Sequence, residues 1–104
     1  MKVAVITGGS RGIGAATARL AARRGYAVCV NYRADEAAAD QVVAQITDGG
    51  GRAIAVRGDV AIEADVVRLF AVVDERLGRL TALVNNAGIL ENCLLYTSDA
   101  ADEL

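Results

Sequence analysis

Residues 7–14 read Thr-Gly-Gly-Ser-Arg-Gly-Ile-Gly, and this stretch decides the fold. It directly follows the apolar run of residues 3–6 and directly precedes an alanine-rich stretch. A buried strand that runs into a glycine-rich turn and then a helix presents backbone N–H groups to a pyrophosphate. The sequence therefore predicts a dinucleotide site at this turn, with a tight turn that binds no ligand as the alternative.

Hydrophobic periodicity predicts four strands that alternate with three helices. The strands are expected over residues 2–7, 26–32, 52–57 and 80–84, and the helices over residues 12–24, 34–47 and 63–77. Connections between parallel strands are right-handed in nearly all proteins. We therefore expect an α/β fold with a Rossmann-like, doubly wound parallel sheet. Only its N-terminal half is expected here, in the order β-α-β-α-β-α-β.

Apolar side chains at helical spacing predict which faces of the helices are buried. In the first helix these side chains are Ile13, Ala16, Thr17, Leu20 and Ala21. In the third helix they are Val66, Val67, Phe70 and Val73. The first two strands are almost unbroken apolar runs, which predicts burial on both faces of the sheet and places Cys29 in the core.

Composition excludes several classes of protein. The 104 residues allow one domain, and a hydrophobic fraction of 54% can support its core. No run approaches the roughly 20 apolar residues of a membrane span or the pattern of a secretory signal, so a cytoplasmic location is expected. The chain has no histidine, its two cysteines have no metal-ligand spacing, and no basic stripe suggests nucleic acid. We expect no metal site.

Each glycine of the motif has a separate expected role. Gly8 allows the tight turn, Gly12 lets the backbone approach phosphate, and Gly14 lets the helix pack closely on the strand. The cofactor-binding residues predicted in this segment are Gly8, Ser10, Arg11, Gly12, Ile13 and Gly14.

A second motif, Asn-Asn-Ala-Gly at residues 85–88, follows the fourth strand. Together with Thr7, Gly8, Gly12 and Gly14, it resembles the short-chain dehydrogenase/reductase family, over residues 1 to about 92. The resemblance implies a homo-oligomeric oxidoreductase that transfers hydride between a nicotinamide and a small-molecule carbonyl or alcohol substrate. It also implies that the glycine turn holds the pyrophosphate, and that Asn86, Ala87 and Gly88 support the sheet beside the cofactor.

The end of the second strand indicates which cofactor is used. NAD-binding sheets usually carry an acid there, which accepts hydrogen bonds from the ribose 2′-OH. Here Tyr32 stands at that place and Arg33 follows it. With Arg11, this second guanidinium suits a 2′-phosphate, so we expect NADP(H) to be preferred, with NAD(H) possible. The alternative is that both arginines are solvated surface charges.

Acidic residues near the expected site have competing interpretations. Asp35 and Glu36 are expected to start the second helix, where carboxylates suit the helix dipole. By resemblance, Asp59 and Val60 border the adenine, and the alternative for Asp59 is to cap the third helix. Neither interpretation makes these carboxylates ligands of the ribose.

The residues that catalyse the family's reaction are missing. By resemblance these are a serine, a tyrosine and a lysine four residues after the tyrosine. Lys2 is the only lysine, so no Tyr-x-x-x-Lys exists and no catalytic residue is assigned. The alternative function is a non-catalytic nucleotide-binding sensor or scaffold. A methyltransferase is disfavoured, because it would need an acid after the second strand.

The last residues differ in character from the body of the chain. Residues 93–103 resemble a translated sequencing-library adapter, and the alternative is a divergent natural tail. We therefore expect a partial NAD(P)-binding domain over residues 1–92, a non-native tail over residues 93–104, and no activity. The strand over residues 80–84 should then expose an unpaired edge, which predicts poor solubility.

Overall fold

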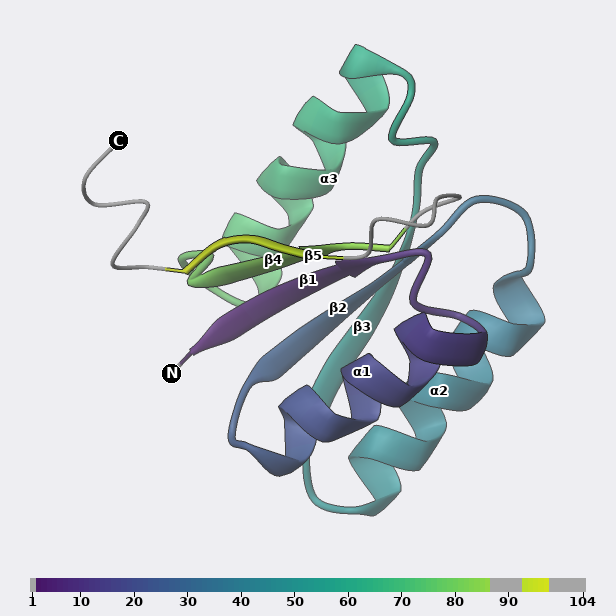
Figure 1. The fold of residues 1–104 in the computed structure, drawn as a ribbon, viewed down its shortest axis with the longest axis vertical. Helices are drawn as coiled ribbons and strands as arrows, with labels where there is room; N and C mark the ends of the chain where they lie inside the picture. Colours follow the sequence, from purple (N-terminus) through teal and green to yellow (C-terminus); the bar gives the residue numbers. More distant parts are fainter. Residues whose placement is uncertain (1, 87–92, 98–104) are drawn as a thin grey trace.

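The structure, a computed structural model, describes residues 2–86 and 93–97 and has strands and helices in alternation (Figure 1). The elements are β1 (Val3–Thr7), α1 (Gly12–Arg23), β2 (Ala27–Tyr32), α2 (Glu36–Asp48), β3 (Arg52–Arg57), α3 (Glu63–Arg76), β4 (Ala82–Asn85) and β5 (Cys93–Thr97). The predicted order β-α-β-α-β-α-β is confirmed for the first seven elements. The element ends differ from the prediction by at most two residues.

The strands form one sheet in the order β3-β2-β1-β4-β5. The first four are parallel, with Val3 opposite Ala27 and Ala4 opposite Ala82. The chain moves outward from β1 to β3 and then returns to the other side of β1, so the winding reverses between β1 and β4. Figure 1 shows α1 and α2 on one face of the sheet and α3 on the other. Ligands of such sheets bind beyond the carboxyl ends of the strands near this reversal.

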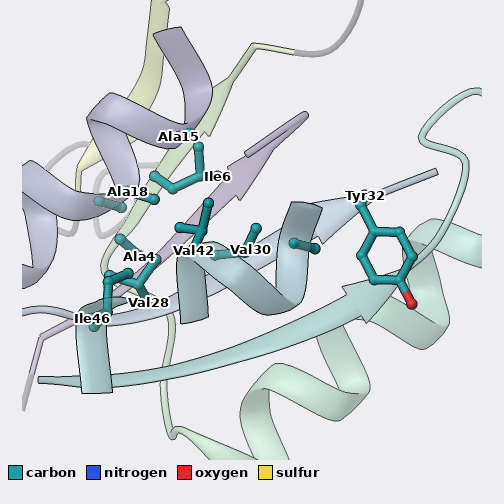
Figure 2. Packing of buried hydrophobic residues seen from close by; sticks show 11 residues of the cluster. Ala4, Ile6, Ala15, Ala18, Val28, Val30, Tyr32, Val42 and Ile46 are labelled. Atoms are coloured by element: carbon teal, nitrogen blue, oxygen red, sulfur yellow. The ribbon is translucent and has the colours of Figure 1, made fainter. Parts of the chain in front are cut away.

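Strands β1 and β2 are buried along their whole length, as predicted. Alternate side chains enter two separate cores, as the twofold repeat of a strand requires. Ala4, Ile6, Val28 and Val30 pack with α1 and α2, and Figure 2 shows this cluster from close by. Val3, Val5, Ala27 and Cys29 pack with α3 on the opposite face. Burial raises the pKa of the Cys29 thiol to about 12, against a weaker opposing effect of Arg76, so Cys29 is a core residue.

The predicted buried face of α1 is displaced by one position, although Ala21, one of its five residues, is partly buried against the core as predicted. The helix buries Gly14, Ala15 and Ala18, whereas Ile13 is 67% exposed and Leu20 is 44% exposed. The helix lies close to the sheet and the glycine turn, and only small side chains fit between them. The periodicity therefore pointed to the larger apolar residues, which lie beside the contact rather than in it.

Two smaller expectations for α3 and β4 are also corrected. Val67 is 64% exposed, and Leu69 takes the inward position together with Val73. Strand β5 pairs antiparallel with β4, so the edge of β4 is not unpaired along this segment. The pairing does not bear on the adapter interpretation of residues 93–104, which stays a prediction.

Candidate functional site

A cleft of about 460 Å³ lies where the glycine turn meets the carboxyl ends of β2 and β3. Three loops form it: those that follow β1, β2 and β3. Its lining residues are Gly8, Ser10, Arg11, Asn31, Tyr32, Arg33, Ala34, Asp35, Asp59, Val60 and Ala61. Seven of them are cofactor-binding residues predicted from the sequence: Gly8, Ser10, Arg11, Tyr32, Arg33, Asp59 and Val60.

The glycine turn needs glycine for two different reasons. Gly8 and Gly12 have φ angles of 62° and 59°, a region that residues with a Cβ rarely adopt. Gly14 is required by space, because a Cβ there would overlap the carbonyl of Gly8 and the side-chain amide of Asn86. The close approach predicted for Gly14 is confirmed. Its partner is the turn rather than the strand.

The two sequence motifs are joined by hydrogen bonds. The Asn86 amide donates to the Gly8 carbonyl at 3.1 Å, and the Asn86 backbone N–H donates to the Thr7 hydroxyl at 2.8 Å. That hydroxyl donates in turn to Asn85 Oδ1 at 3.1 Å. Asn86 therefore holds the backbone of the glycine turn in place from the side of β4. Ala87 and Gly88, the other predicted residues of this motif, lie outside the described residues.

Asn31 joins the same framework from the other side and was missed by the sequence prediction. Its buried amide donates to the carbonyls of Val56 at 3.2 Å and Gly58 at 3.1 Å. Its own carbonyl accepts the N–H of Gly9 at 3.0 Å. The ends of β1, β2 and β3 are thus tied together beneath the cleft. The available signal was a polar residue within the last two positions of an otherwise apolar strand.

Tyr32 forms part of the cleft wall and is only 7% exposed. Its ring lies at one end of the cluster of buried side chains (Figure 2). Its hydroxyl donates to Glu36 Oε2 at 3.0 Å. Burial first, and then this hydrogen bond and the charge of Glu36, raise the pKa of the Tyr32 phenol. Tyr32 therefore stays neutral and bonded to Glu36.

The lining of the cleft carries two cations, Arg11 and Arg33, and two acids, Asp35 and Asp59. Asp35 caps α2 as expected, with Oδ1 accepting the Ala38 N–H at 3.0 Å. Its other oxygen lies 3.8 Å from Arg11 Nε. The sequence predicts only the first of these two roles, at the start of the helix. The second role depends on a residue 24 positions away, which local sequence does not reveal.

Asp59 lies in the loop before α3 and does not cap that helix. Its Oδ1 accepts the N–H of Ala61 at 2.9 Å, whereas the N-cap position is Ile62. Its backbone N–H donates to Asp65 Oδ2 at 2.8 Å. The capping alternative is therefore wrong. Asp59 and Val60 lie in the cleft wall, where they can face a ligand.

Three predicted residues of the glycine motif lie beside the cleft rather than in it. Gly12 and Ile13 are exposed at the start of α1, and Gly14 is buried beneath the turn. Among the side chains of residues 2–86, no group of three acidic, histidine or cysteine residues could hold a metal ion. None of the helices in the same range is long and apolar enough to cross a membrane.

Comparison with known proteins agrees with this geometry. The family model described as short chain dehydrogenase matches residues 2–103. The uncharacterized oxidoreductase YgfF of Escherichia coli is 50% identical over 90 residues, which are 86% of this chain and 36% of YgfF. A 3-oxoacyl-(acyl-carrier-protein) reductase of Synechocystis is 48% identical over 101 residues, 97% of this chain and 41% of that reductase.

Solved structures show the same likeness. A dehydrogenase/reductase from Sinorhizobium meliloti superposes with a TM-score of 0.82 and 44% identity, over 85% of this chain and 35% of that one. The chain thus spans well under half the length of each of these relatives. Its sequence motifs, strand order and matches agree, and the chain belongs to the short-chain dehydrogenase family.

Proposed function

We propose that the cleft binds the adenosine end of NADP(H), and that the chain is the cofactor-binding part of an oxidoreductase. When bound, the nicotinamide of this cofactor supplies or accepts hydride. The enzyme would act on a carbonyl or alcohol carbon of a small molecule. Membership of the family supports the oxidoreductase class, and the charged residues of the cleft support the choice of cofactor.

The glycine turn fits a pyrophosphate. Nothing lies within 4 Å of the place where a Cβ of Gly12 would stand, so the backbone is open to a ligand there. The first turn of α1 contains no acid, whereas the first turns of α2 and α3 each contain at least one. An anion at the α1 N-terminus would therefore meet the positive end of the helix dipole without repulsion from the same turn.

The single observation that carries the choice of NADP(H) is the pair of guanidiniums in the cleft. Arg11 and Arg33 line it from the loops after β1 and β2, and Arg11 is 78% exposed. Tyr32 occupies the place of the ribose acid, and its hydroxyl is bonded to Glu36. A 2′-phosphate could accept charge-assisted hydrogen bonds from both guanidiniums. A 2′-hydroxyl, in contrast, would have no carboxylate at position 32 to accept its hydrogen bond.

Binding without turnover is the expected behaviour of this chain, because its only lysine is Lys2. The same fact favours a second candidate function, a nucleotide-binding protein with no hydride transfer. Sequencing of the source DNA beyond the Asn92 codon separates the two. A frame that continues into Tyr-x-x-x-Lys supports the oxidoreductase, and a true stop after Leu104 supports the nucleotide-binding protein.

Titration calorimetry with 2′,5′-ADP and 5′-AMP tests the proposal. We expect 2′,5′-ADP to bind more tightly, and Arg33→Gln to weaken it about tenfold while 5′-AMP changes by less than about twofold. Arg24→Gln is the matched control, since Arg24 lies after α1 at the opposite end of the sheet. Equal affinity of the unaltered protein for both nucleotides would overturn the NADP(H) preference.

A further inference from the structure

The acid that faces Arg11 across the cleft has no part in the function proposed above. Arg11 Nε and Asp35 Oδ2 are 3.8 Å apart, and both side chains lie in the cleft wall. Their side chains are 78% and 41% exposed, so a ligand can reach both of them. The pair therefore stands where the 2′-phosphate of the proposed cofactor would bind.

The position of the Asp35 carboxylate is fixed by its own helix. Oδ1 accepts the Ala38 N–H at the start of α2, and this bond turns Oδ2 toward Arg11. An N-cap bond of this kind holds the side chain in one rotamer. The carboxylate is therefore a stationary charge, and Arg11, with no capping bond of its own at the start of α1, is the partner that can move.

We propose that Asp35 limits the preference for the 2′-phosphate, because its carboxylate competes with that phosphate for Arg11. This inference rests on the proposed function. A 2′-phosphate must draw the guanidinium away from Asp35 and also approach a fixed negative charge. A ligand with only a 2′-hydroxyl meets neither penalty. Asp35 therefore reduces the difference in affinity between NADP(H) and NAD(H).

The variant Asp35→Asn isolates the charge. Asparagine is as good an N-cap as aspartate, so the bond to Ala38 is retained while the competition for Arg11 is removed. We expect the affinity for 2′,5′-ADP to rise about fivefold at low ionic strength. The affinity for 5′-AMP should change by less than about twofold, and the gain should shrink in 0.5 M salt because exposed charges are screened.

Two controls separate this effect from a general change of charge. Asp48→Asn makes the same change at the far end of α2 and should leave both affinities unaltered. In an Arg11→Gln background, Asp35→Asn should lose most of its benefit, because the two residues act on one ligand group. Unchanged melting temperatures would show that the cap of α2 is intact in each variant.

The outcomes distinguish failure of this inference from failure of the proposed function. If the unaltered protein binds neither nucleotide, the proposed function is wrong, and the inference falls with it. If 2′,5′-ADP binds but Asp35→Asn does not strengthen it, only the inference is wrong. An equal gain in Asp48→Asn, or a full gain without Arg11, would also overturn it.

Discussion

Two glycine-rich segments of this chain have similar composition and different surroundings. The turn at residues 7–14 lies at the carboxyl ends of the strands, and the turn at residues 49–51 lies at their amino ends, between α2 and β3. In the second turn, the N–H groups of Gly50 and Gly51 bond back to Thr47 and Ile46 of their own helix. That turn is a helix ending and a connection.

The first turn is bonded to neighbouring strands instead. Gly9 donates to the carbonyl of Asn31 at the end of β2, and Gly8 accepts from Asn86 beyond β4. The backbone of this turn is therefore held on both sides, with its open face toward the cleft. Glycine content alone therefore does not distinguish the two turns. The strand ends that surround the first turn distinguish it from the second.

The largest expected effect comes from Gly14→Ala. The added Cβ would overlap the Gly8 carbonyl and the Asn86 amide, which are parts of one braced framework and cannot both move aside. We expect the free energy of unfolding, measured in urea, to fall by about 3 kcal/mol and nucleotide binding to be lost.

The matched control for this change is Gly50→Ala at the other turn. Gly50 has a φ of 89°, but nothing lies within 4 Å of the added Cβ. Only conformational strain remains, so a loss of about 1 kcal/mol is expected with no change in nucleotide affinity. Equal losses of unfolding free energy in Gly14→Ala and Gly50→Ala would contradict the distinction between the two turns.

The next effect in size comes from Asn86→Ala. It removes the amide that bonds the Gly8 carbonyl and should cost about 1–2 kcal/mol of stability in urea unfolding. Nucleotide affinity should fall as well, because the turn loses its support on the β4 side.

A comparable amide at the amino end gives the control. Gln45 accepts from Arg19 at 3.2 Å on an exposed surface, and Gln45→Ala should change stability by no more than about 0.5 kcal/mol. A larger loss from Gln45→Ala than from Asn86→Ala would mean that the two motifs are not joined as described.

Features of the fold that depend on local sequence could be predicted, and those that depend on packing could not. The strands, the helices and the glycine turn follow from local pattern, and each was confirmed. The inward face of α1 was missed because its contact uses Gly14, Ala15 and Ala18, and small residues give a weak hydrophobic signal. A helix this close to the sheet is fixed by packing, which periodicity does not measure.

The site shows the same division. Residues carried by a motif, such as Gly8 and Arg11, could be placed from the sequence. The hydrogen bonds of Asn31 and the contact of Asp35 with Arg11 could not, because they depend on partners from other loops. Contacts between distant segments thus mark the limit of what local pattern predicts. The pairing of β4 with β5 was missed for another reason, because residues 93–104 were interpreted as a non-native tail and no strand was expected there.

The smallest expected effect is an insertion at the amino-end turn. Adding Gly-Ser between Gly51 and Arg52 leaves the bonds of Gly50 and Gly51 to α2 intact and lengthens only the connection to β3. The entropic cost of closing a loop grows slowly with its length. The free energy of unfolding should therefore change by about 0.5 kcal/mol or less, and nucleotide affinity should be unaltered. The same insertion between Gly9 and Ser10 would move Ser10 and Arg11, which line the cleft, away from the hydrogen bond that ties Gly9 to Asn31. Nucleotide binding should then be lost. Retained binding after that second insertion would show that the turn needs only its glycines, and the strand ends around it would no longer explain its function.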